Sequence, residues 1–196
     1  MSASGLKHYL PGFDQALNSL KEDVTLMANL VIRNLANARA GFAERDEDFS
    51  AAVIADDDEV DLLEKQVDRL GTEILIRYQP MITDLRTVLA TIKLSNILER
   101  ASNHAVMIAR RSRKMADDSF PVEEQEQLLT HFDAVLRLFG EAIIAFREID
   151  TVSAGRVLGQ SESVAAAGRG FVEKFTELLE ERPCTEVAVT HCYKDR

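Results

Sequence analysis

The sequence predicts an all-α fold of six helices arranged in two tandem repeats. Hydrophobic residues make up 46% of the 196 residues, while Gly (9) and Pro (4) are few. The Pro residues fall between segments of helical periodicity, as is typical of helix boundaries. The chain also repeats internally: Val53 lies 104 residues before Val157, and Val60 lies 104 residues before Val164. A repeat of this length indicates two copies of one helical unit.

The first repeat, residues 1–118, is predicted to hold three long helices over about 12–42, 49–77 and 83–115. Their apolar residues alternate at four- and three-residue spacing, the pattern of a bundle helix. In the first helix these residues are Phe13, Leu17, Leu20, Val24, Met27 and Val31, and in the second they are Val60, Leu63, Val67, Leu70 and Ile74. A charged turn over 44–48 separates these two helices. Pro80 ends the second, because the residue before Pro avoids the α region.

The second repeat, residues 119–196, is predicted to hold helices over about 123–148 and 152–181, with Pro183 ending the latter. A further helix is expected to begin near Thr185, and only about a dozen residues remain for it. Its counterpart in the first repeat has about thirty. The expected fold is therefore two pseudo-symmetric three-helix bundles in tandem, the second apparently truncated at its C-terminus.

Charge and composition restrict the classes of function. The net charge of −10 argues against extensive contact with nucleic acid, where Lys and Arg must neutralise phosphates. The sequence lacks an apolar run long enough for a membrane span and lacks the apolar core of a signal peptide at its start. We therefore expect a cytoplasmic protein, in which Cys184 and Cys192 are reduced thiols.

Acidic and amide side chains recur at one-turn spacing on two neighbouring predicted helices. In the helix over 49–77 they are Asp57, Asp61, Glu64 and Asp68, and in the helix over 83–115 they are Asn96, Glu99 and Asn103. Side chains four residues apart lie on one face of a helix. Two such faces that meet can share a hard or borderline cation, since oxygen ligands suit such ions.

A second interpretation of the same residues needs no metal. The acids of the helix over 49–77 would then form a solvated flank beside the apolar seam. Glu99 would pair with Arg100, Arg86 or Lys65. Periodicity alone favours this interpretation over a metal site.

Several short motifs of the first repeat resemble the PhoU family. They are Asp57-Asp58-Glu59-Val60-Asp61-Leu62-Leu63-Glu64, then Arg77-Tyr78-Gln79-Pro80, Asp84-Leu85-Arg86, and Leu98-Glu99-Arg100 through His104. The family comprises cytoplasmic regulators of bacterial phosphate uptake. The resemblance implies two three-helix bundles in tandem, and metal clusters on E-x-x-x-D motifs in the members that bind metal. It also implies two partners, the phosphate ABC transporter and the phosphate-sensing histidine kinase. We also expect a homodimer.

The resemblance assigns Glu64, Asp68, Glu99 and Asn103 as metal ligands for a divalent or trivalent ion (iron, zinc, manganese or magnesium). Asn103 departs from the pattern, which has Asp there, so the site carries one negative charge fewer. The second repeat departs further, because Gly168 and Val172 stand at the positions equivalent to Glu64 and Asp68. At most one metal cluster is expected on this chain.

The function expected from the resemblance is that of a negative regulator and not of an enzyme. It would restrain phosphate uptake and phosphate-starvation signalling by binding transporter and kinase. The alternative left open is a helical accessory domain that regulates a different phosphate or ion permease. A ferritin-like metal enzyme is disfavoured, because that class needs Glu-x-x-His motifs and the sequence has none.

Overall fold

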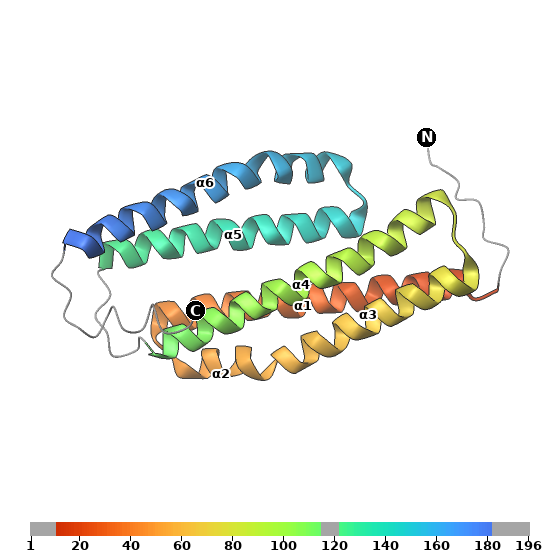
Figure 1. The fold of residues 1–196 in the computed structure, drawn as a ribbon, viewed down its shortest axis with the longest axis horizontal. Coiled ribbons are helices and arrows are strands. Elements are labelled where there is room, and N and C mark those ends of the chain that lie inside the picture. The colour runs from red at the N-terminus through yellow and green to blue at the C-terminus, as the bar shows by residue number, and fades with distance from the viewer. Residues whose placement is uncertain (1–10, 115–121, 182–196) are drawn as a thin grey trace. The chain divides into compact units, whose positions relative to one another are not determined.

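The computed structural model describes residues 11–114 and 122–181, and all regular structure in these ranges is helical (Figure 1). The helices are α1 (Phe13–Glu44), α2 (Glu47–Ala55), α3 (Asp57–Tyr78), α4 (Ile82–Lys114), α5 (Val122–Glu148) and α6 (Thr151–Glu181). The all-α prediction is confirmed, and the bounds of α1, α4, α5 and α6 agree with the predicted ranges to within two residues. The helix predicted from Thr185, with Cys184 and Cys192, lies outside the described residues.

The chain divides into two compact units. The first comprises Met1–Asp118 with Arg147–Ile149, and the second comprises Ser119–Phe146 and Asp150–Arg196. Helices α1 to α4 belong to the first unit. Helices α5 and α6 account for most of the described part of the second.

The single helix predicted over 49–77 is wrong, because the structure breaks this segment at Asp56 into α2 and α3. The predicted turn over 44–48 is also shorter, since only Arg45 and Asp46 separate α1 from α2. Asp46 is the N-cap of α2, and its carboxylate accepts a hydrogen bond from the backbone N–H of Asp48 at 2.8 Å. The acidic residues Glu47 and Asp48 of the predicted turn therefore belong to the first turn of α2. Negative charge is favoured there by the helix dipole.

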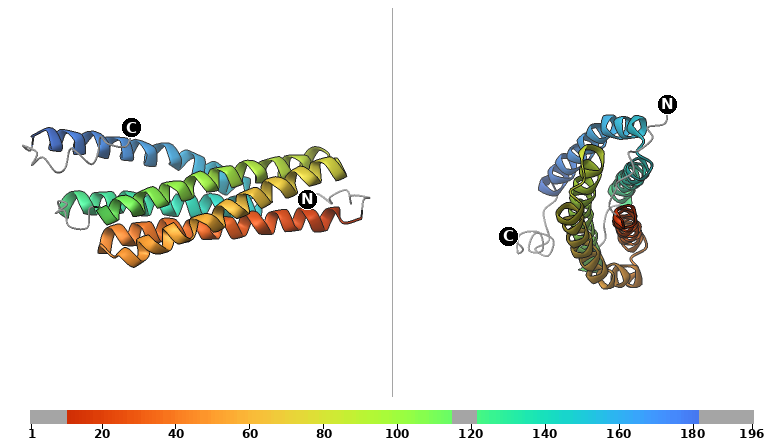
Figure 2. Two further views of the ribbon diagram at one scale, coloured as in Figure 1. Left: turned by 60° about the horizontal axis from the view of Figure 1, so that its bottom comes forward. Right: turned by 90° about the vertical axis from the view of Figure 1, so that its right-hand side faces the viewer.

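Helix α1 runs antiparallel to α2 and α3 (Figure 2). At one end, Gly41 lies so close to α2 that a Cβ there would stand 2.9 Å from Ser50 Oγ. Midway along, Gln66 of α3 donates a hydrogen bond to Asp23 of α1 at 2.8 Å. At the other end, the rings of Phe13 and Tyr78 meet edge to face at 5.5 Å between centroids.

Helix α4 runs antiparallel to α2 and α3, so it is parallel to α1 (Figure 2). Gly71 of α3 and Ile92 of α4 mark the closest approach: a Cβ on Gly71 would stand 2.6 Å from Ile92 Cδ1. Gln79 ends α3 in the left-handed conformation with φ 46°, and the chain turns through Pro80 into α4. The first unit is thus a three-helix bundle whose second helix is interrupted.

The core of the first unit consists of the apolar seams that the sequence predicts. Its largest fully buried apolar side chains are Phe13, Leu20, Val24, Met27, Val31, Val53, Val60, Val67, Ile74, Val88 and Leu98. Burying a side chain of this size stabilises a fold by roughly 1.5–3 kcal/mol relative to exposing it. These contacts hold the outward polar faces of α3 and α4 in a fixed register.

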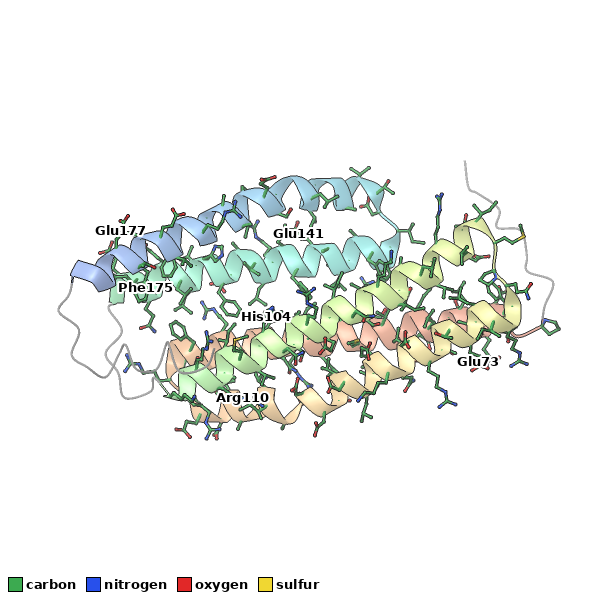
Figure 3. All side chains as sticks on the ribbon, viewed as in Figure 1. Glu73, His104, Arg110, Glu141, Phe175 and Glu177 are labelled. Carbon is green, nitrogen blue, oxygen red and sulfur yellow. The ribbon has the colours of Figure 1, made fainter. Side chains whose placement is uncertain are left out.

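The described part of the second unit is the pair α5 and α6. Asp150 caps α6 by accepting hydrogen bonds from the backbone N–H groups of Val152 (3.0 Å) and Ser153 (3.1 Å). Glu141 of α5 pairs with Arg156 of α6 at 3.7 Å. Figure 3 marks Glu141 on α5 and Phe175 and Glu177 on α6. None of the helices in the described ranges has the length and hydropathy to cross a membrane.

Candidate functional site

The four predicted ligands lie on the adjacent helices α3 and α4. Glu64 and Asp68 are one turn apart on α3, and Glu99 and Asn103 are one turn apart on α4. The pKa of Glu64 is raised, first by partial burial and then by the negative charges of Asp68 and Glu99. The structure therefore brings the three carboxylates within electrostatic range of one another. Lys65 only partly offsets their repulsion, by lowering the pKa of Glu64.

Asn103 is engaged with its neighbour on α4. Its side-chain Nδ2 donates a hydrogen bond to Glu99 Oε1, so one carboxylate oxygen of Glu99 is already occupied. Among the described residues, no three carboxylate, imidazole or thiol groups converge on a point that could hold a metal ion. The side chains as they stand do not form a ready-made metal centre, and Glu99 would have to rotate away from Asn103 to contribute both oxygens.

The ion pairs of the first unit fall elsewhere on its surface. Arg77 pairs with Glu73 at 3.7 Å along α3, and Arg113 of α4 pairs with Glu47 of α2 at 3.8 Å. Glu99 forms no ion pair within residues 11–114 and 122–181. The structure thus lacks, in these ranges, the pairing of Glu99 with Arg100, Arg86 or Lys65 that the metal-free interpretation requires.

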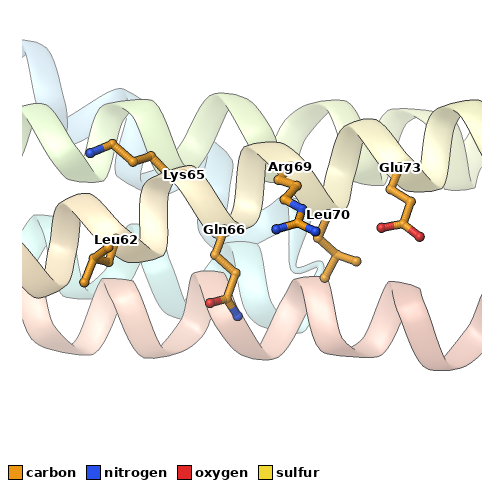
Figure 4. A pocket seen from close by; sticks show the side chains of 6 residues that line it. All are labelled: Leu62, Lys65, Gln66, Arg69, Leu70 and Glu73. Carbon is orange, nitrogen blue, oxygen red and sulfur yellow. The ribbon is translucent and has the colours of Figure 1, made fainter.

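The remaining features of α3 and α4 do not add ligands to this face. A shallow groove on α3 is lined by Leu62, Lys65, Gln66, Arg69, Leu70 and Glu73 (Figure 4). Its charged side chains are the cations Lys65 and Arg69 and the anion Glu73, and none of the four predicted ligands lines it. His104 is exposed on α4, one residue after Asn103.

Comparison with known proteins identifies the first unit. Residues 24–112 match the family described as "PhoU domain", which covers α2 and α3, most of α1 and nearly all of α4. Residues 24–112 of this chain form a PhoU domain.

Two curated relatives show how far the similarity extends. The chain is 29% identical over 145 residues to the "phosphate-specific transport system accessory protein PhoU homolog 1" of Thermotoga maritima, covering 74% of this chain and 62% of that protein. It is 28% identical over 148 residues to the corresponding PhoU homolog of Aquifex aeolicus, covering 76% and 66%. The chain therefore spans less than two thirds of the length of both relatives.

The PhoU fold itself extends over both units. The crystal structure of PhoU from Pseudomonas aeruginosa superposes with a TM-score of 0.84 at 23% sequence identity, covering 87% of this chain and 82% of that one. All four predicted ligands lie inside the matched PhoU domain.

Sequence reasoning missed two buried polar residues inside this PhoU domain. Asn34 of α1 is fully buried, and Ser102 of α4 is 1% exposed. Asp57, expected at the edge of the buried face, is partly buried at the start of α3 against the Ser102 hydroxyl. Burial and the charges of Asp61 and Asp58 raise the pKa of Asp57, although Arg110 of α4 opposes this effect. The four- and three-residue spacing, continued past Val31, would have placed Asn34 in the seam.

Proposed function

We propose that this protein is a regulatory accessory protein of phosphate transport that restrains phosphate uptake and phosphate-starvation signalling. The single observation that carries the proposal is the PhoU domain over residues 24–112. The curated relatives described as accessory proteins of phosphate-specific transport support it. In this proposal the protein is cytoplasmic and non-enzymatic, and it acts by binding the phosphate ABC transporter and its sensor histidine kinase.

The experiment is a phosphatase reporter of the phosphate regulon, measured in high phosphate with the gene deleted. We expect high reporter activity in the deletion strain and repression when the gene is returned. Normal repression without the gene would contradict the proposal. Altered uptake through another permease, with the reporter unchanged, would favour the accessory-domain alternative.

Binding is tested separately with purified proteins. We expect the chain to bind the transporter's ATPase subunit and the cytoplasmic part of the kinase in titration calorimetry. Size-exclusion chromatography with light scattering measures whether the chain is the proposed homodimer. Absence of binding to both partners would refute the proposed route of regulation, even if the reporter result stood.

We further propose that a hard cation binds at Glu64, Asp68, Glu99 and Asn103. The repulsion between Glu64, Asp68 and Glu99 supports this proposal, because a cation would relieve it and lower the pKa of Glu64. An all-oxygen donor set suits magnesium, manganese or iron better than zinc. The cation must displace the amide of Asn103 from Glu99, which predicts modest affinity.

Manganese binding, followed by electron paramagnetic resonance, tests the cation site. We expect Glu99→Gln to weaken binding, while Glu22→Gln, a change at an exposed acid of α1, leaves it unaltered. Equal binding by both variants would refute the site. If Glu99→Ala abolishes repression in the reporter strain while the fold is intact, the acidic face takes part in regulation.

A further inference from the structure

Four side chains of the first unit hold buried polar atoms that lack hydrogen-bond partners within the described residues, and three of these side chains lie in one part of the core. They are Asn34, at both Oδ1 and Nδ2, Asp57 at Oδ1, and Ser102 at Oγ. Asn34 is 0% exposed and Ser102 is 1% exposed. Leaving one buried polar group unpaired costs about 1–3 kcal/mol, so native structures seldom leave several unpaired.

The register of the bundle places these three residues at one level. Arg33 of α1 pairs with Asp56 at 2.7 Å, which sets Asn34 beside the start of α3. Asn34 belongs to the buried seam of α1, so it lies on the core side of that level. The Ser102 hydroxyl of α4 faces the Asp57 carboxylate closely enough to oppose the rise in the pKa of Asp57, but the two groups do not reach normal hydrogen-bond geometry. One polar layer thus crosses the core between α1, α3 and α4.

The break between α2 and α3 lies at the same level. No Pro or Gly occurs between Glu47 and Leu70, although these residues cause most helix breaks. The backbone continues across the break through a hydrogen bond from the Asp56 N–H to Ala52 O (3.0 Å) and one from the Glu59 N–H to Asp56 O (3.2 Å). A further known cause of such a break is a side chain or a water molecule inserted beside the helix.

The chemistry of the three side chains decides which ligand fits the layer. Asn34 needs both an acceptor for its Nδ2 and a donor for its Oδ1. A bare cation would satisfy the oxygens but would leave Nδ2 unpaired, and the charge of Arg110 near Asp57 opposes a cation. Water donates and accepts, and a buried water typically makes about three hydrogen bonds.

We propose that ordered water binds in the core between Asn34, Asp57 and Ser102, and that this hydration site keeps α2 and α3 apart as separate helices. Water accepts from the Asn34 amide, donates to the Asp57 carboxylate and bonds to the Ser102 hydroxyl. The site is distinct from the acidic face formed by Glu64, Asp68 and Glu99.

A crystal structure of the full chain at a resolution that shows water tests the site directly. We expect a solvent peak within hydrogen-bond distance of all three side chains. A direct hydrogen bond between Asn34 and Asp57 without a solvent peak would overturn the proposal. So would an anomalous peak there after soaking in rubidium chloride, because that would identify a monovalent cation.

Amide hydrogen exchange tests the effect on the helix break. In the double variant Asn34→Leu, Ser102→Ala, two of the three water partners are lost. The amides of residues 57–59 should then exchange more slowly by roughly fivefold, the factor that one net hydrogen bond supplies. The control is Ser50→Ala, which removes another unpartnered buried hydroxyl, in α2 and outside the layer, and should leave this exchange unchanged. Equal effects of the two changes would refute the role in the break.

Discussion

Replacing Glu64 by Gln should stabilise the protein at neutral pH. Partial burial disfavours the charge of the Glu64 carboxylate, and the charges of Asp68 one turn away and of Glu99 on α4 repel it. Each like-charge contact of this kind costs about 0.2–0.5 kcal/mol on a helix surface. Because Glu64 remains partly exposed and solvent screens it, we expect the free energy of unfolding to rise by no more than about 1 kcal/mol.

The pH dependence of this gain follows from the direction of the pKa shift. The folded state raises the pKa of Glu64 above its ordinary value of 4.5, so the folded state binds this proton more tightly than the unfolded chain does. Below the ordinary pKa the group is protonated in both states and costs nothing. As the pH rises through the raised pKa, the charge appears and the full penalty develops. The benefit of Gln should therefore grow over the same range.

Urea denaturation of wild type and variant across this pH range, with chelator present, measures the effect. Glu22→Gln is the matched control, because Glu22 is an exposed acid of α1. High salt should shrink the gain, since the Debye length falls to about 3 Å at 1 M. A Glu64→Gln variant that is no more stable than wild type at neutral pH, or whose gain persists at low pH, would refute the reasoning.

Three further predictions concern the fold and are measured by denaturation followed with circular dichroism. Leu98→Ala should cost about 2–5 kcal/mol because Leu98 is fully buried, while Leu62→Ala, at a side chain that is 65% exposed, should stay within about 0.5 kcal/mol; equal costs would contradict the assigned core. Gly71→Ala should destabilise by about 1–3 kcal/mol through its clash with Ile92, and Ile92→Val should recover part of this loss; a purely additive double variant would argue against that contact. Asp150→Ala should lower the melting temperature at neutral pH by removing the cap of α6. The cap's hydrogen bonds hold the pKa of Asp150 below 3.8. The stability that the ionised cap adds to the fold is therefore present above that value and is lost as the pH falls through the lowered pKa. The melting temperatures of variant and wild type should converge there.

The sequence allowed the helices and their buried faces to be predicted, because a seam such as Phe13 to Val31 is a local pattern that packing preserves. The break at Asp56 could not be predicted in the same way. Arg33 of α1 meets Asp56, and Ser102 of α4 meets Asp57, only after the bundle has formed. Local propensity within the segment itself favours a continuous helix.

The candidate site could also be predicted only in part from the sequence. One-turn spacing predicted that Glu64 and Asp68 share a face of one helix, and that Glu99 and Asn103 share a face of another. The rotation of α4 against α3, which brings Glu99 near Glu64, depends on close packing such as that of Gly71 against Ile92. The hydrogen bond from Asn103 to Glu99 is a choice of rotamer that no spacing rule determines.

The short turn between α3 and α4 has a consequence for the order of folding. Only Gln79, Pro80 and Met81 separate these helices, so their contacts close small loops, whereas α1 meets α4 across about seventy residues of chain. We expect the α3 and α4 hairpin to form in the folding transition state and α1 to dock afterwards. In chevron kinetics, Val67→Ala should then mainly slow folding and Met27→Ala should mainly speed unfolding. The reverse pattern would place α1 in the nucleus. The same polar helix faces proposed to bind a cation would thus be juxtaposed early, before the core that supports them is complete.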